Sequence, residues 1–190
     1  MLGLRVETAA GWVDGILDNF DAFLIDHAAC ERKASANAMH FVVRYADKAP
    51  LVEPMIALAR EELEHFHQVY QLIQARGLQL GSDHKDPYVG AMLTPARKSG
   101  GERLLDRLLI FGIVEARGCE RFGIVAEHLP PGELKTFYTG LAQAEARHHG
   151  LFIRIAKQLF DEEEVMARQD LFLDHEAAVI AELPFRASLH

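Results

Sequence analysis

Two Glu-x-x-His motifs are the residues of this sequence whose types and spacing best suit metal chemistry. They are Glu62-Leu-Glu-His65 and Glu145-Ala-Arg-His148. On a helix, residues three positions apart share a face, so each motif directs one carboxylate and one imidazole to the same point. These groups are ligands that iron, manganese and zinc accept from proteins.

Both motifs interrupt stripes of apolar residues that recur every three or four positions. Such a stripe is the buried face of an amphipathic helix, so the motifs occupy positions where core residues are expected. The same periodicity identifies two more stripes, each interrupted by one glutamate, Glu31 or Glu115. Four helices are therefore predicted to place four glutamates and two histidines in a bundle interior.

The predicted heights of these groups along the bundle also agree. Glu31 and the first motif lie at similar distances from the turn near Pro50, and Glu115 and the second motif are nearly symmetric about Pro130-Pro131. Four buried carboxylates without cations would be very costly, whereas two bound metal ions neutralise them. A Glu from each of two helices plus Glu-x-x-His from each of two others is the di-iron or di-manganese arrangement. The predicted ligands are Glu31, Glu62, His65, Glu115, Glu145 and His148.

Two competing sets of residues are less favourable. Glu120 follows Cys119 as Glu31 follows Cys30, but its register would bring Arg117 into the apolar stripe. Glu64 and His67 also form Glu-x-x-His, yet their register passes through polar residues and predicts a solvated face.

Three residues beside the predicted ligands are candidates for supporting roles. His27, one turn before Glu31, is interpreted as a neighbouring histidine rather than a seventh ligand. Glu61 is a candidate to orient a metal-bound histidine, with a solvated face as the alternative. Cys119, one turn beyond Glu115, is small enough to leave room for dioxygen or substrate, with close helix packing as the alternative.

The elements that must position these groups are helices, since no segment shows sustained period-two alternation. The two long helical hairpins are joined by a crossover of about twenty-four residues, which is the one-long-crossover topology of ferritin-like folds. We therefore predict an all-α, ferritin-like four-helix bundle with an additional C-terminal helix, as a single domain over 1–190. The predicted helices span 18–46, 52–76, 101–128, 132–160 and 163–182, with a short helical turn around Trp12.

Composition excludes several classes of protein. The 190 residues are 49% hydrophobic and 25% charged, which excludes disordered and low-complexity chains. The longest apolar run, Leu108 to Val114, is far shorter than the roughly 20 residues that span a bilayer. Two cysteines predict no disulfide framework, so we expect a cytoplasmic protein without membrane association.

Four sequence blocks together resemble the tRNA 2-methylthio-N6-isopentenyladenosine hydroxylase family. The blocks begin at Asp26, Arg60, Ile113 and Glu145, and the most specific is Glu115-Ala-Arg-x-Cys-Glu-Arg-Phe122. The resemblance implies a non-haem di-iron monooxygenase that uses O₂ to hydroxylate the isopentenyl chain of a modified adenosine next to the anticodon. By position it implies that the six predicted ligands hold two iron ions. It also implies a tRNA substrate and an external electron donor, a reductase or ferredoxin-type protein.

The charge distribution bears on how RNA is held. The net charge is −8, and residues 161–190 carry eight acidic and two basic side chains, which does not favour RNA binding there. Basic residues beside the crossover are the candidates for phosphate contact, with a solvated helix start as the alternative. They are Arg97, Lys98, Arg103 and Arg107.

Other functions use the same ligand types. A bacterioferritin- or rubrerythrin-like protein that handles iron or peroxide is one alternative, and a manganese catalase is another. Cys30 and Cys119 cannot supply the Cys-x-x-Cys pair of a rubredoxin-type site. An iron-storage protein must assemble into a cage, whereas we expect a monomer or dimer.

Overall fold

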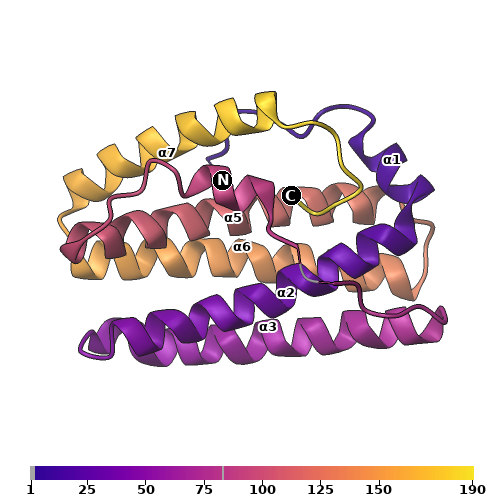
Figure 1. Cartoon of the computed structure of the whole chain (residues 1–190), viewed down its shortest axis with the longest axis horizontal. Helices are drawn as coiled ribbons and strands as arrows, with labels where there is room; N and C mark the ends of the chain where they lie inside the picture. The colour runs from indigo at the N-terminus through magenta and orange to yellow at the C-terminus, as the bar shows by residue number, and fades with distance from the viewer. Residues whose placement is uncertain (1–2, 83) are drawn as a thin grey trace. The chain divides into compact units, whose positions relative to one another are not determined.

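The computed structural model describes residues 3–82 and 84–190, and within them the regular structure is entirely helical (Figure 1). Two compact units are present. The α2–α3 unit comprises Asp14–His84 and Arg186–Leu189, and the α5–α6 unit comprises Lys85–Phe185 with His190 and the N-terminal residues up to Val13. The helices are α1 (Trp12–Asp18), α2 (Phe20–Arg44), α3 (Ala49–Ala75), α4 (Pro87–Met92), α5 (Gly100–His128), α6 (Glu133–Leu159) and α7 (Glu162–Glu182).

In the α2–α3 unit, two long helices form an antiparallel hairpin. Their apolar stripes supply buried residues such as Phe23 and Leu24 from α2 and Met55 and Val69 from α3. α3 begins three residues earlier than predicted, because Pro50 lies in its first turn. A proline is tolerated there, since the first N–H groups of a helix have no partner within it.

In the α5–α6 unit, α5 packs against α6 on one side and against α7 on another. Gly112 lets α5 and α6 approach closely, since a Cβ at this position would lie only 3.1 Å from the Cβ of Phe152. The Nδ1 of His149 lies 2.6 Å from the carbonyl oxygen of Gly112, which fixes the same contact. As a result α5 is buried on most of its circumference.

A buried network of polar side chains joins α5 to α7 and to the N-terminal segment. The guanidinium of Arg117 is fully buried and donates to both carboxylate oxygens of Glu176, at 2.8 and 3.0 Å. It also donates to the carbonyl oxygen of Val6 at 2.9 Å. The hydroxyl of Tyr88 donates to Glu176 at 3.1 Å. The network therefore connects parts of the unit that are far apart in the sequence.

The crossover between α3 and α5 contains a short helix, α4, where sequence patterning predicted only a loop. Asp86 caps this helix, because its side chain accepts hydrogen bonds from the N–H groups of Tyr88 at 2.8 Å and Val89 at 3.2 Å. Pro87 occupies the first helical position. The α4 helix packs on α7.

Contacts divide the chain into the two units described above. Whether these units form the single domain predicted over 1–190 stays a prediction. Among the helices formed by the described residues, none is long and apolar enough to cross a membrane.

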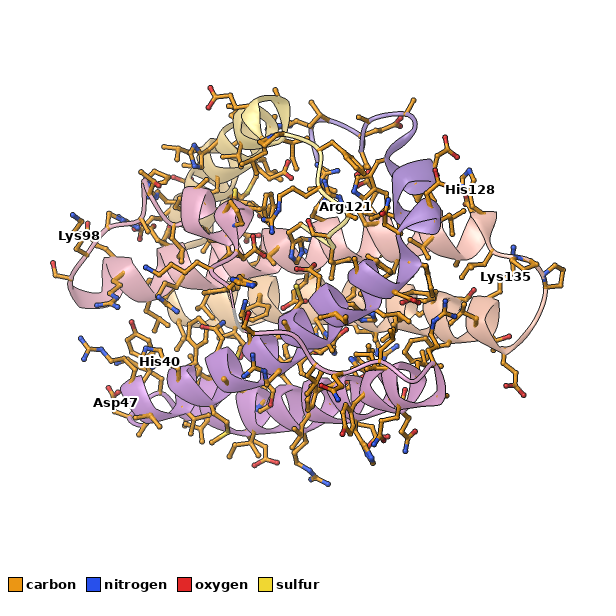
Figure 2. The ribbon with its side chains drawn as sticks, turned by 45° about the vertical axis from the view of Figure 1, so that its right-hand side comes forward. His40, Asp47, Lys98, Arg121, His128 and Lys135 are labelled. Carbon is orange, nitrogen blue, oxygen red and sulfur yellow. The ribbon has the colours of Figure 1, made fainter. Side chains whose placement is uncertain are left out.

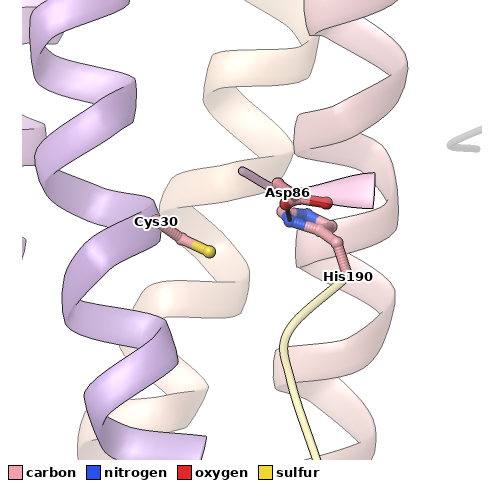
Figure 3. A group of neighbouring side chains, drawn as sticks. All are labelled: Cys30, Asp86 and His190. Carbon is pink, nitrogen blue, oxygen red and sulfur yellow. Dashed lines mark ion pairs between the residues drawn. The ribbon is translucent and has the colours of Figure 1, made fainter. Parts of the chain in front are cut away.

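Asp86 supports a prediction about acid stability. Its carboxylate pairs with the Nδ1 of His190 at 3.3 Å (Figure 3). The imidazole of His190 stacks on the ring of Tyr88. Burial alone would raise the pKa of Asp86, but the hydrogen bonds and charge of His190 and the two N–H groups lower it from 3.8 to about 2. Because the pKa of Asp86 is lower in the folded than in the unfolded chain, its charge stabilises the fold at any pH above the unfolded-state pKa. This stabilisation is lost as the pH falls toward 2.

We therefore expect Asp86→Asn, which keeps a capping oxygen but removes the charge, to be about 2 kcal/mol less stable than the wild type near neutral pH. The difference should disappear between about pH 4 and pH 2 in urea-unfolding curves. Asp174→Asn is the control, because that carboxylate is 74% exposed and the substitution should change stability by no more than about 0.5 kcal/mol at any pH. A difference that does not vary with pH would contradict the role given to the charge.

Candidate metal centre

The α2–α3 hairpin brings three of the predicted ligands together. Glu31 on α2 and the Glu62/His65 pair on α3 are all buried. The Nδ1 of His65 lies 3.0 Å from an oxygen of Glu62 and 3.7 Å from an oxygen of Glu31. Two carboxylates and one imidazole therefore converge within this unit, as the spacing of the motif predicts.

His27 contacts the other oxygen of Glu31. Its Nε2 lies 2.7 Å from that oxygen, and its ring is fully buried and stacks on Phe23. Because one carboxylate oxygen faces His27 and the other faces His65, the orientation of Glu31 is fixed. This position fits the interpretation of His27 as a neighbour of the ligands, although the role itself stays a prediction.

The surroundings of Glu31 and His65 favour the charged forms of both side chains. Burial alone would raise the pKa of Glu31, but hydrogen bonds with His27 and His65 and their charges hold it well below its usual range. Burial alone would lower the pKa of His65, but Glu31 and Glu62 raise it to about 9. The two carboxylates thus stabilise positive charge at the point between them, which is the property required of a cation site.

The α5–α6 hairpin supplies the other three predicted ligands. Glu115 on α5 and the Glu145/His148 pair on α6 are buried. The Nδ1 of His148 lies 3.5 Å from an oxygen of Glu145. Gly118 on α5 faces Glu145, since a Cβ on this glycine would lie 3.7 Å from the Cγ of Glu145. The glycine therefore leaves space beside this carboxylate.

The competing residues have other surroundings. Glu120 accepts hydrogen bonds from the N–H of Thr8 at 2.7 Å and from its hydroxyl at 2.6 Å, and it pairs with Arg117. Its carboxylate is thus directed to the N-terminal segment. Glu64 and His67 are exposed on α3, in agreement with the solvated face expected for their register.

The two remaining candidates for supporting roles, Glu61 and Cys119, are both half-buried. Burial raises the pKa of the Cys119 thiol, and the charge of Glu120 raises it further. The thiol therefore stays protonated, as expected for a small packing residue and not for a metal-bound thiolate. The orienting role of Glu61 stays a prediction.

The four basic residues predicted to contact phosphate differ in their surroundings. Arg97 donates to the buried carboxylate of Asp106 through its guanidinium at 2.8 Å and through its backbone N–H at 2.8 Å. Its guanidinium also pairs with Glu102 at 3.1 Å and Glu164 at 3.4 Å. An RNA phosphate would have to compete with three carboxylates, so the surroundings of Arg97 do not support the predicted contact.

The guanidinium of Arg107 lies over the ring of Phe111, 5.1 Å from its centroid. Lys98 is exposed near the start of α5 (Figure 2), and Arg103 is half-buried. Of the four, Lys98 and Arg103 remain the better candidates for phosphate contact.

A family model matches residues 2–190, nearly the whole chain, and its description is tRNA-(MS2IO6A)-hydroxylase (MiaE). The chain belongs to this family. This match confirms the resemblance found in the sequence, and it places the chain among hydroxylases and not among storage proteins or catalases.

Two relatives bear the name tRNA 2-(methylsulfanyl)-N(6)-isopentenyladenosine(37) hydroxylase. The one from Pseudomonas putida is 35% identical to this MiaE-family chain, over 85% of this chain and 78% of the relative. The one from Salmonella typhimurium is 29% identical, over 93% of this chain and 83% of the relative. The family resemblance thus extends over most of each sequence.

A solved structure is also similar to this MiaE-family chain. It is "Protein 43 with aldehyde deformylating oxygenase activity" from Synechococcus, with a TM-score of 0.92 and 36% identity, over 98% of this chain and 94% of that one. Together with the order of the helices, the match confirms the predicted all-α, ferritin-like fold class with a long crossover and an additional C-terminal helix.

Proposed function

We propose that this chain is a tRNA hydroxylase that adds oxygen to the isopentenyl side chain of 2-methylthio-N6-isopentenyladenosine next to the anticodon. The observation that carries the proposal is the repeated ligand set, one glutamate and one Glu-x-x-His motif buried in each of two helical hairpins. Membership of the MiaE family and the names of both curated relatives support this substrate.

The donor set fits a pair of iron ions. Each hairpin contributes two carboxylates and one imidazole, a combination that suits iron and manganese better than structural zinc, which favours thiolates. We propose that the two hairpin sets together hold two irons. When bound, the iron pair supplies the activation of O₂ and the removal of hydrogen from an unreactive methyl group. The residues that would hold it are Glu31, Glu62, His65, Glu115, Glu145 and His148.

The chain's own residues would orient the ligands and keep water away. His27 fixes the orientation of Glu31 through the 2.7 Å contact. Buried apolar side chains on the helices that carry the ligands, among them Leu24 and Phe152, would limit the access of water to the centre. The space beside Glu145 at Gly118 is where a small reactant has room.

The reaction also needs partners that the chain itself does not supply. Hydroxylation with O₂ consumes two electrons from outside, so we propose a reductase or ferredoxin-type donor. The tRNA substrate implies action in the cytoplasm, and we propose a monomer or dimer as the working form.

Nucleoside analysis tests the proposed function. Transfer RNA that carries the isopentenyl nucleoside would be incubated with iron-loaded protein, a reductant and O₂, then digested and analysed by mass spectrometry. We expect the isopentenyl nucleoside to gain one oxygen atom, and only when O₂ is present. An unchanged nucleoside with fully iron-loaded protein would refute the proposal.

A second candidate is oxygenase activity on an aldehyde. It is favoured by the 36% identity with the Synechococcus protein, whose name states aldehyde deformylating oxygenase activity. The same iron-loaded protein would be supplied with an aldehyde instead of tRNA. Loss of the formyl carbon from the aldehyde, together with an unchanged tRNA nucleoside, would favour this second function over the first.

A further inference from the structure

A pocket of about 680 Å³ lies on the surface of the α2–α3 unit, apart from the converging carboxylates. Its walls come from α2, from Phe66 on α3, from the beginning of the crossover and from residues 186–188. This volume is within the range of about 300–1,000 Å³ that is typical of small-ligand sites. The α2 wall consists of Ala22, Ile25, Asp26, Ala29, Arg32 and Lys33, positions that follow helical spacing.

Contacts within the chain hold the walls of this pocket in place. The crossover approaches α2 closely at Gly81, where a Cβ would lie 3.0 Å from a methyl carbon of Ile25. The ammonium of Lys33 donates to the carbonyl oxygen of His84. The carboxylate of Asp26 accepts a hydrogen bond from the N–H of Leu189 at 2.8 Å. The walls of the pocket are thus fixed by packing and hydrogen bonds within this unit.

The side chains of the pocket combine positive charge with an aromatic ring. Arg32 and Arg186 are exposed, and Lys33 adds a third cation. Asp26 is the carboxylate among the described lining residues, and the Leu189 N–H already engages it. Phe66, the lining residue on α3, is half-buried. Cations beside an aromatic surface are the combination with which proteins bind single-stranded nucleic acids, through phosphate contact and base stacking.

The pocket is close in sequence to the predicted ligands but faces another way. Arg32 directly follows Glu31, and Phe66 directly follows His65. At about 100° per residue, Ala29 in the middle of the α2 wall points roughly 160° away from Glu31 around the helix axis. A nucleotide in the pocket would therefore not be the one that is modified.

We propose that this pocket binds a nucleotide of the single-stranded anticodon loop that neighbours the modified adenosine. Arg32 and Arg186 contact phosphates of the loop, and the ring of Phe66 stacks on a base. Recognition of unpaired, splayed nucleotides is the usual way in which proteins read RNA loops. The inference rests on the proposed function, because it takes the same tRNA as the ligand. The basic side chains of the pocket could instead dock an acidic electron-donor protein, but the aromatic wall and the concave shape favour a nucleotide.

The test measures the affinity of the full chain for a synthetic anticodon stem-loop RNA by fluorescence anisotropy at several salt concentrations. We expect the double variant Arg32→Glu/Arg186→Glu to bind at least about tenfold more weakly, with a salt dependence lower by about one unit of slope for each lost phosphate contact. Phe66→Leu, which keeps an apolar side chain but not the stacking face, should weaken binding with no change in the salt slope.

The matched control is Arg44→Glu/Lys48→Glu, which makes the same charge change at two exposed positions near the α2–α3 turn and should leave the affinity unchanged. Unaltered RNA affinity in the Arg32/Arg186 variant would overturn the inference, and so would a loss of affinity confined to the control variant. A variant that binds RNA normally but is reduced slowly by the electron donor would assign the pocket to that donor instead. The proposed function fails separately, if the wild-type protein leaves the tRNA nucleoside unchanged.

Discussion

The Glu62→Gln variant is expected to lose iron and hydroxylase activity together, by more than about a hundredfold. Residues that only support a metal ligand typically change metal affinity or activity by about 10–100-fold, and a ligand should exceed this range. Glu62 is fully buried, and its carboxylate lies 3.0 Å from the imidazole of His65. An amide at this position keeps the shape of the side chain but removes the negative charge that a cation requires. Iron per chain, measured after anaerobic loading, and nucleoside analysis are the two measurements.

Glu64→Gln is the control for this experiment because it makes the same chemical change on the same helix. Glu64 is exposed, and its carboxylate only accepts a hydrogen bond from Gln68 at 2.9 Å. The control should retain both iron and activity. If Glu62→Gln retained normal iron content, Glu62 would not be a ligand, and the centre would have to be assigned to other residues.

Arg117→Met is expected to lower the free energy of unfolding by about 3–5 kcal/mol, because it leaves Glu176 as an uncompensated buried charge. For a chain of this size the melting temperature should fall by roughly 6–20 °C. Both side chains of the pair are fully buried, and two hydrogen bonds of 2.8 and 3.0 Å join them. Thermal and urea unfolding would measure the effect.

The double variant Arg117→Met/Glu176→Leu distinguishes two contributions to the free energy of unfolding. One is the loss caused by leaving a single charge buried, and the other is the net contribution of the intact ion pair. Replacing both charges with apolar side chains of similar size should recover much of the lost stability, because the carboxylate of Glu176 is no longer left buried without Arg117. Asp174→Asn serves as a surface control, since Asp174 is 74% exposed and pairs with Arg5 at 3.3 Å. It should change stability by no more than about 0.5 kcal/mol. A single variant as stable as the wild type would show that the buried pair has no structural importance.

The long helices and the ligands within each hairpin were accessible to sequence reasoning. A glutamate that interrupts a regular apolar stripe is conspicuous, because a core position otherwise excludes charge. Glu31, Glu62 and His65 converge in one unit for this reason. How the two hairpin sets meet depends on packing between units, and it stays a prediction.

Other features were missed because tertiary packing decides them. Arg117 and Asp106 lie outside the predicted apolar stripe of α5, and α7 covers the face of α5 that carries them. The buried carboxylate of Asp106 binds both Arg97 and Arg168, the latter at 2.7 Å, which no local pattern reveals. A second apolar stripe on α5, with Leu105, was the available signal that another helix packs there.

The short helix α4 was missed for a different reason. Six residues are too few to show a helical period. The pair Asp86-Pro87, a capping residue followed by a proline, nevertheless carries the signature of a helix start. Capping residues therefore indicate short helices inside long crossovers even where the apolar residues show no helical period.

The contact between the N-terminal segment and α5 has a practical consequence for preparing the protein. Val6 and Thr8 supply oxygens that hold Arg117, at 2.9 and 3.3 Å, and the hydroxyl of Thr8 also accepts from Arg121 at 3.3 Å. Trimming the chain past Thr8 to improve crystals would let water reach two arginines that the fold shields. A purification handle placed close to Thr8 would strain the same contacts, so a long spacer should precede it.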